Sequence, residues 1–125
     1  SGILVYLGVS ARDTESDIDY CVSKVVNLRI FPDEAGKMNL SLLDTGKGIM
    51  VVSQFTLYGD MRKGRRPSFD AAAAPEVAEA FYRKFLEKLR AMDLSPREGR
   101  FQAHMDVRYV NDGPVTILID SEKIF

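Results

Sequence analysis

The pattern of apolar and polar residues along the chain predicts a single α+β domain with a mainly antiparallel sheet and two helices. Two stretches have helical spacing. The other apolar stretches are short, rich in β-branched and aromatic residues, and separated by turns that contain glycine or proline. The chain has 125 residues, 46% of them hydrophobic, which fits one compact domain over residues 1–125.

The first part of the chain predicts a strand followed by a helix. Residues 3–9 form a nearly continuous apolar run before a polar stretch, which is typical of a strand buried on both faces inside a sheet. Thr14 and Asp17 have the spacing of a capping box, and apolar residues follow at helical intervals through residues 18–28. We therefore expect a helix of about three turns, with Cys21 on its apolar stripe as a buried structural thiol.

The rest of the chain alternates short apolar runs with turns, except for one long helix. The segment 29–43 contains the turn sequence Pro-Asp-Glu-Ala-Gly and predicts a hairpin. Residues 49–58 form the strongest strand candidate, and residues 59–74 predict a surface loop. A proline at the first helical position predicts a second helix over residues 75–92. Its apolar face is expected to contain Val77, Phe81, Phe85, Leu89 and Met92. The apolar segments 105–110 and 115–119 predict two strands, joined in a β-hairpin or tight β-connection near the end of the chain.

Composition narrows the possible classes of protein. The chain carries 17 basic and 18 acidic residues, so its net charge is -1 and any contact with RNA must use a local patch. One cysteine cannot form an intrachain disulfide, and one cysteine with one histidine cannot form a structural zinc site. No metal or organic cofactor is expected. The apolar runs are too short to cross a bilayer and no signal sequence opens the chain, which predicts a cytoplasmic protein without a membrane partner.

Polar residues continue the apolar strand candidate 49–58 near its end. If the strand stays regular, Gln54 and Thr56 point to the same face as the apolar Val52. Either the strand emerges into solvent there, or its end is the floor of a pocket. In such a pocket the hydroxyls of Ser53 or Thr56, with N–H groups near Gln54 and Phe55, are candidate donors to an oxyanion. Nothing in the sequence brings the single histidine, His104, beside these hydroxyls, so no catalytic triad is predicted.

Two other segments are candidates for function. Asn111 to Thr116 contains Gly113 and Pro114, and it is either an ordinary turn or a loop with special geometry. A cis peptide bond cannot be predicted from the residues themselves. The second segment is a basic run, which either binds phosphates or is a solvated surface stretch. It consists of Arg62, Lys63, Arg65 and Arg66.

Residues 53–59 (SQFTLYG) together with residues 111–116 (NDGPVT) resemble the paired signature of D-aminoacyl-tRNA deacylases. Further segments resemble the family at matching places, so the resemblance covers essentially the whole chain. These segments are Asn27–Phe31, Gly36–Ser41, Arg62–Phe69 and Gly99–Phe101.

The resemblance implies a homodimer with a barrel-like core and an active site at each subunit junction. There the cis Gly113–Pro114 loop of one chain would enter the partner's pocket, accept the D-aminoacyl group of the tRNA and exclude the L form by steric clash. Ser53, Gln54, Phe55 and Thr56 would line the catalytic end, with Phe101 and Met105 near the aminoacyl or adenosine group. Thr56 has no visible base, so assistance from the ribose hydroxyl of the substrate is favoured over a threonine nucleophile. Glycyl-tRNA is a further expected substrate, because glycine lacks the side chain that is rejected.

The chain departs from the family at its start. The resemblance implies an additional strand and hairpin before residue 2, including an arginine that braces the Gly-Pro loop, so we expect an N-terminally short chain. Ser1 and Gly2 without an initiator methionine agree with processing or truncation. Two alternatives are a non-catalytic RNA-binding module that uses the loop Arg62–Arg66, and a structural dimerising domain. The RNP-like aromatic signatures of an RNA-binding module are missing, and the paired signatures argue against a structural dimerising domain.

Overall fold

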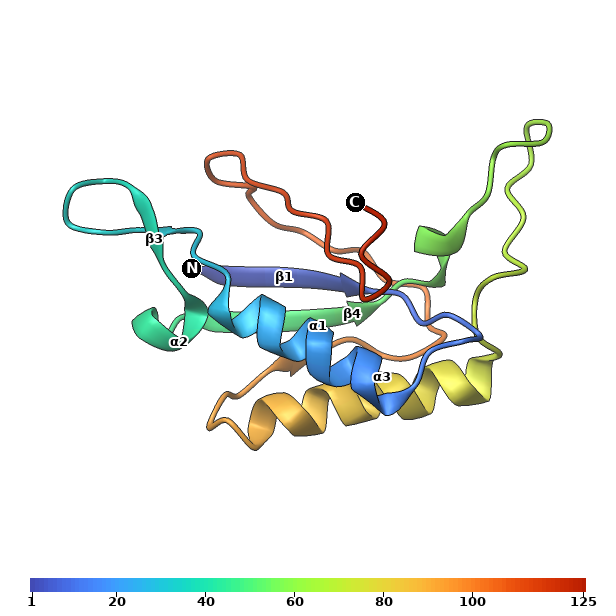
Figure 1. The fold of residues 1–125 in the computed structure, drawn as a ribbon, viewed down its shortest axis with the longest axis horizontal. Coiled ribbons are helices and arrows are strands. Elements are labelled where there is room, and N and C mark those ends of the chain that lie inside the picture. The colour runs from blue at the N-terminus through green and yellow to red at the C-terminus, as the bar shows by residue number, and fades with distance from the viewer.

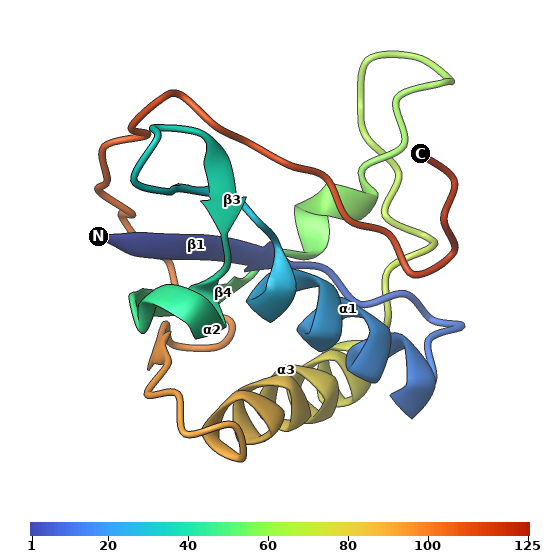
Figure 2. The ribbon, with the colours of Figure 1, turned by 60° about the vertical axis from the view of Figure 1, so that its left-hand side comes forward.

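The computed structural model describes residues 1–125 as a mixed α/β fold with two small sheets. The elements in chain order are β1 (Gly2–Leu7), α1 (Glu15–Asn27), β2 (Phe31–Pro32), β3 (Met38–Leu40), α2 (Leu42–Thr45), β4 (Gly48–Ser53), a 3₁₀ helix η1 (Phe55–Tyr58), α3 (Pro75–Arg90) and β5 (Arg97–Glu98). Helices α1 and α3 lie next to each other on one side of the sheet formed by β1 and β4 (Figures 1 and 2).

The main sheet is parallel, so the prediction of a mainly antiparallel sheet is wrong. Its strand order is β1-β4-β5, and β1 runs parallel to β4 from the pair Gly2 and Gly48 to the pair Leu7 and Ser53. β4 and β5 are also parallel. Parallel neighbours need a crossover connection, and α1 and α3 lie in the two crossovers. Among the named strands, the antiparallel pair is the β2–β3 hairpin, which confirms the hairpin predicted within residues 29–43.

Both long helices are confirmed, and each begins where the sequence predicts. Thr14 and Asp17 form the capping box of α1, and Pro75 is in the first turn of α3. The buried face of α3 is rotated from the predicted one, because Val77 and Met92 are exposed. The residues of α3 that are buried are Ala78, Tyr82, Phe85, Leu86 and Leu89. Helix α2, a third and short helix, replaces the end of the predicted strand 38–43, where Ser41 caps it and accepts a hydrogen bond from the Asp44 N–H at 3.1 Å.

The core lies between the two helices and one face of the sheet. It joins buried residues of α1 and α3 to Ile49 and Val51 of β4, with Ile3, Val5 and Leu7 of β1 packed against them. β1 is an edge strand and none of its residues is fully buried, so the prediction of a strand buried on both faces is wrong. Its free edge has no hydrogen-bonded neighbour, and its residues line an open hollow.

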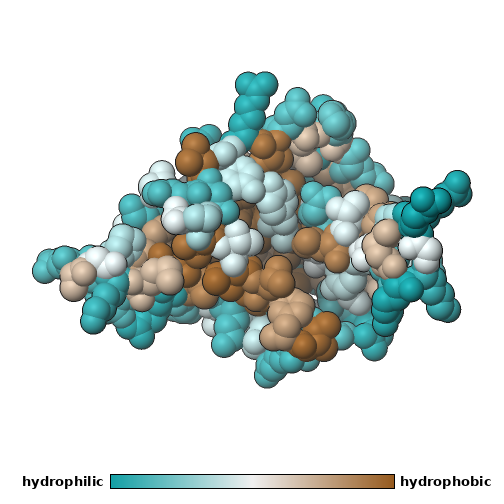
Figure 3. All heavy atoms as spheres, turned by 90° about the horizontal axis from the view of Figure 1, so that it is seen from above, coloured by the Kyte–Doolittle hydropathy of each residue, from teal (hydrophilic) through white to brown (hydrophobic).

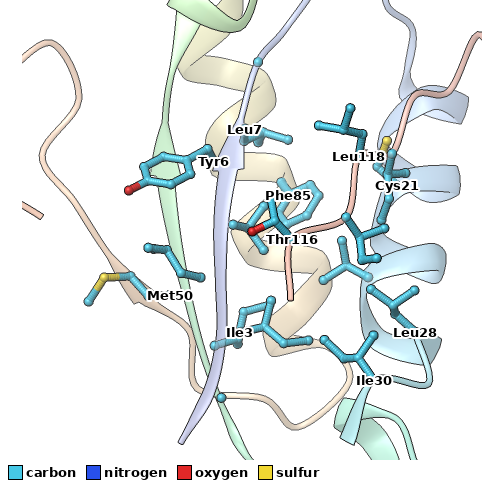
Figure 4. A pocket seen from close by; sticks show the side chains of 18 of the residues that line it. Ile3, Tyr6, Leu7, Cys21, Leu28, Ile30, Met50, Phe85, Thr116 and Leu118 are labelled. Atoms are coloured by element: carbon cyan, nitrogen blue, oxygen red, sulfur yellow. The ribbon is translucent and has the colours of Figure 1, made fainter. Parts of the chain in front are cut away.

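The predicted strands within residues 105–119 do not form. This segment is extended but has no ladder partner, and Val110 is 90% exposed. It passes the free edge of β1 and helps to enclose a hollow of about 1550 Å³ with mostly apolar walls. Apolar side chains gather around this opening (Figure 3), and Ile3, Cys21, Leu118 and their neighbours point into it from β1, α1 and the C-terminal segment (Figure 4). None of the helices combines the length and apolar character needed to cross a membrane.

Candidate active site

The polar end of β4 is a tight turn and not a continued strand. β4 ends at Ser53, and the Gln54 N–H donates to the Leu7 carbonyl at 2.8 Å, which fastens the turn to the end of β1. The chain then enters η1 at Phe55. The prediction that Gln54 and Thr56 point to one face of a strand through residue 58 is therefore wrong, because the chain leaves the sheet between them.

The turn nevertheless brings these two side chains together. The Gln54 amide nitrogen donates a hydrogen bond to the Thr56 hydroxyl oxygen. Thr56 is exposed, while Ser53 and Gln54 are half-buried. Since the Thr56 oxygen already accepts from an amide, its own proton remains available for donation to another group. The contact orients a hydrogen-bond donor and supplies no base.

Two main-chain donors near this turn remain unused. The first hydrogen bond of η1 runs from the Leu57 N–H to the Gln54 carbonyl at 3.3 Å, so the N–H groups of Phe55 and Thr56 precede it. The Gln54 N–H is occupied by β1 and is not an oxyanion donor. His104 is 94% exposed, and its one ionic neighbour is Asp106 at 3.7 Å. No hydrogen bond joins His104 to Ser53 or Thr56.

The basic run is a projecting loop with an internal ion pair. Asp60 and Ser68 form an isolated antiparallel bridge that closes the loop. The Arg62 guanidinium binds both carboxylate oxygens of Asp60, with the shortest contact at 2.6 Å. Hydrogen bonding from Arg62 lowers the pKa of Asp60 to about 2. Lys63, Arg65 and Arg66 are exposed and form no ion pair, so they are the free cations of the loop.

Phe101 and Met105 lie beside the sheet, on the segment that follows β5. The Phe101 ring packs against Tyr82 with ring centroids 6.2 Å apart. Met105 approaches Gly99 so closely that a methyl group there would lie 2.7 Å from the sulfur. The buried Tyr82 hydroxyl donates to the Val51 carbonyl at 2.8 Å and accepts from the Gly99 N–H at 3.2 Å. Burial raises the pKa of Tyr82, which therefore stays a neutral hydrogen-bonding bridge between β4 and this segment.

The Gly113–Pro114 segment is an ordered loop with a cis peptide bond. Asn111 braces it, because its side-chain oxygen accepts from the Val115 N–H at 3.2 Å and its amide donates to the Thr116 hydroxyl at 3.0 Å. Gly113 has a φ of +128°, which L side chains rarely adopt.

Within one chain, the predicted site residues form separate groups. The loop around Gly113 lies near the N-terminal end of β1, whereas η1 and the basic loop lie beyond its C-terminal end (Figures 1 and 2). None of the residues 53–56 lines the large hollow. No group of three or more metal-binding side chains is present.

Sequence reasoning missed three residues that organise these groups. Tyr82 fell outside the predicted face of α3, although a large aromatic one position after Phe81 in an apolar stripe was an available signal. Asp60 is two residues from Arg62, a separation at which a loop aspartate can pair with an arginine. Phe69 contacts Phe55 with centroids 5.0 Å apart, and no sequence pattern links these two positions.

The fold and these groups define a class of protein: a small α/β domain with a hydroxyl and amide pair at a strand end and a cationic loop beside it. The sequence profile described as D-Tyr-tRNA(Tyr) deacylase matches residues 1–120. The chain is 60% identical over 124 residues to a D-aminoacyl-tRNA deacylase of Symbiobacterium thermophilum, covering 99% of this chain and 82% of that protein. It is 54% identical over 125 residues to the D-aminoacyl-tRNA deacylase of Thermosipho africanus, covering 100% and 84%.

Two solved structures have a similar fold. One, titled c-Myc DNA Unwinding Element Binding Protein, matches with a TM-score of 0.86 and 46% identity over 93% of this chain and 79% of that one. A second, titled as a structural analysis of a probable eukaryotic D-amino acid tRNA deacylase, matches with a TM-score of 0.64 and 26% identity over 73% and 54% of the two chains. The chain belongs to the D-Tyr-tRNA(Tyr) deacylase family.

Proposed function

We propose that the chain hydrolyses the ester bond of D-aminoacyl-tRNA and releases free D-amino acid and tRNA. The observation that carries this proposal is the family match over residues 1–120, together with relatives more than half identical that are named D-aminoacyl-tRNA deacylase. The polar turn after β4 supplies groups suited to an ester, and the family match favours an enzyme over a non-catalytic RNA-binding module.

In the proposed reaction, water attacks the ester carbonyl with help from the neighbouring ribose hydroxyl of the tRNA. The unused N–H groups of Phe55 and Thr56 are the oxyanion donors, and the Thr56 hydroxyl orients the substrate. The Gln54 contact supports this assignment, because the amide only donates to the Thr56 oxygen and no carboxylate or histidine accepts the Thr56 proton. Loss of one oxyanion donor in such a site costs about 2–4 kcal/mol of barrier.

Chiral selectivity is proposed to come from the Gly113–Pro114 loop of a second copy. Within one subunit the Gly113–Pro114 loop and the Gln54–Thr56 turn lie near opposite ends of β1, so they can form one site only between two subunits of a homodimer. Rigid main-chain atoms held by Asn111 would clash with an L side chain and leave space for a D side chain. Glycyl-tRNA would be accepted as well. Phe101 and Met105 are proposed to contact the aminoacyl or adenosine group.

The basic loop is proposed to bind the tRNA backbone through Lys63, Arg65 and Arg66, with Arg62 held by Asp60 at its start. A net charge of -1 does not oppose this role, because the cations are concentrated at one exposed loop. No metal or organic cofactor takes part in the proposed reaction, and the reaction is assigned to the cytoplasm, where charged tRNA is used.

The test is release of D-tyrosine from D-tyrosyl-tRNA, compared with release of L-tyrosine from the L form. The unchanged protein should prefer the D substrate, and Pro114→Ala should lower this preference. Thr56→Ala should keep most of the rate, because its hydroxyl orients and does not attack. Equal rates on both enantiomers would refute the function. Complete loss of activity in a folded Thr56→Ala variant would refute the ribose-assisted mechanism.

A further inference from the structure

An aromatic pair lies at the surface just after β4 ends. Phe55, at the start of η1, is 54% exposed, and its ring meets the half-buried Phe69 edge to face at an interplanar angle of 69°. Phe69 lies so close to Gly59 that a methyl group there would be 3.3 Å from the ring. Neither ring belongs to the hydrophobic core. The pair is therefore fixed by local contacts while a large part of the Phe55 ring faces solvent.

The aromatic pair is the base of the cationic loop. Phe69 directly follows Ser68, which closes the loop by two hydrogen bonds with Asp60 at 2.8 and 3.0 Å. Figure 1 shows this loop projecting from the domain beyond η1, and the exposed cations Lys63, Arg65 and Arg66 belong to it. A chain of phosphates that follows the loop would bring its bases down onto the rings.

The combination has the chemistry of a single-stranded nucleic acid site, where cations follow the backbone and aromatic faces stack the bases. We infer that the Phe55–Phe69 pair stacks a base of the single-stranded 3′ end of the tRNA, at a nucleotide that precedes the one carrying the ester. The inference rests on the proposed function, which brings the ester to the adjacent Gln54–Thr56 turn. Stacking on a ring tolerates any base, so this contact serves every tRNA equally.

The charges of the loop divide into two roles. Arg62 is fixed by its two-pronged contact with Asp60, and this pairing also raises the pKa of Arg62. It braces the start of the loop. Lys63, Arg65 and Arg66 have no carboxylate partner and bind phosphates, which draws the adjacent nucleotide onto the rings.

The decisive comparison uses two substrates that differ only in the nucleotides before the ester. D-tyrosyl-tRNA contains them, and 3′-O-D-tyrosyl-adenosine does not. Phe69→Leu should lower kcat/KM for the tRNA substrate about 5- to 150-fold, the range of one lost base stack, and should affect the adenosine ester far less. Phe69→Tyr keeps an aromatic face and should restore the tRNA rate. Phe125→Leu, at another exposed phenylalanine, is the matched control and should change neither rate.

Equal losses on both substrates would overturn the inference, because the ring would then act on the chemistry or on folding. An unchanged tRNA rate in Phe69→Leu would overturn it too. The charge contribution is tested by replacing Lys63, Arg65 and Arg66 with alanine, which should reduce the salt slope of tRNA binding by about 2. The control Lys37→Ala, at the exposed turn of the β2–β3 hairpin, should leave the salt slope unchanged. If the triple variant also leaves the slope unchanged, these three cations do not contact phosphates.

Stacking can also be measured without hydrolysis. An uncharged RNA hairpin that ends in CCA is made with 2-aminopurine in place of the nucleotide before the terminal adenosine. Binding of the unchanged protein or Phe69→Tyr should quench its fluorescence, and Phe69→Leu should not. If the unchanged protein hydrolyses neither ester, the proposed function fails. The fluorescence quenching still shows whether a base stacks on the aromatic pair, because it does not depend on hydrolysis. Equal fluorescence with all three proteins at saturation would overturn the inference alone.

Discussion

Removing the hydroxyl of Tyr82 tests whether one buried group holds the two walls of the proposed site together. Tyr82 is 2% exposed, and its hydroxyl bridges the Val51 carbonyl in β4 and the Gly99 N–H after β5. β4 ends two residues after Val51, and Gly99 contacts Met105. The substitution Tyr82→Phe keeps the ring and its packing against Phe101, so it changes the bridge alone.

The size of the effect follows from the two lost bonds. A buried group left without its partner costs about 1–3 kcal/mol. The Val51 carbonyl lies in the central strand β4, which is hydrogen-bonded to a strand on each side. The Gly99 N–H therefore accounts for most of the free-energy cost of losing the hydroxyl. We therefore expect a loss of about 2 kcal/mol in the free energy of unfolding. For a domain of this size the loss corresponds to a fall in Tm of roughly 8 °C.

Urea unfolding followed by circular dichroism measures this loss, with Tyr20→Phe as the control. The ring of Tyr20 contacts lysine side chains, and its hydroxyl forms no hydrogen bond within the protein, so the control should stay within about 0.5 kcal/mol of the parent. Deacylation by the folded Tyr82→Phe variant should show a raised KM for D-tyrosyl-tRNA, because the Gly99–Met105 wall loses its anchor. Equal stability of the two variants would refute the bridging role.

Three further changes test separate parts of the structure. Gly113→Ala would bring a methyl group to 2.9 Å from the Val115 side chain at a φ of +128°, so the ratio of D- to L-tyrosine released should fall, and an unchanged ratio would argue against a rigid loop. Burial raises the pKa of Cys21 to about 11 from 9.0, so little of the thiol is ionised at pH 8. Alkylation of Cys21 at pH 8 should therefore be about 100-fold slower than alkylation of an unperturbed thiol. A rate equal to that of an unperturbed thiol would contradict the raised pKa. Ser41→Ala removes the cap of α2 and should cost about 1 kcal/mol in urea unfolding, with Ser16→Ala in the first turn of α1 as a control of small effect.

The helices were predictable because their signals are local. The Thr14–Asp17 capping box and Pro75 act within one helical turn, and the structure contains both. The face of α3 was less accurate, since a stripe read from spacing alone cannot tell which neighbour the helix packs against. Tyr82 points inward because its hydroxyl finds partners in β4 and near β5, a contact that spans 31 residues.

The sheet could not be derived in the same way. Strand direction depends on which segments become neighbours, and β1 and β4 pair across more than forty residues of chain. The continuous apolar runs of residues 3–9 and 49–52 are typical of parallel strands, but they do not say which segments pair. Residues 105–119 show the limit most clearly: their apolar pattern predicts strands, yet a strand also requires a hydrogen-bonded partner, and this segment forms no ladder with β1 or any other strand.

The sequence singles out the candidate site residues, and it does not predict how they are arranged. The polar residues Ser53, Gln54 and Thr56 at the end of an apolar run were visible in the sequence. The switch into η1 was not, although it decides which donors are free. Because the chain turns into η1, the Gln54 N–H donates to β1 and the N–H groups of Phe55 and Thr56 have no partner. The Gln54 side-chain amide donates to the Thr56 hydroxyl.

This geometry also explains why the proposed site needs a second chain. Thr56 is exposed in one chain, and water is not excluded from the turn around it. Hydrogen-bond donors facing bulk water stabilise a developing oxyanion weakly, and they become effective when the surroundings are dry and fixed. In the proposed dimer the partner's Gly113–Pro114 loop would cover the turn, exclude water and reject the L side chain at once. Rate and chiral selectivity would then depend on the same contact, which links the two signature segments more directly than their separation within one chain indicates.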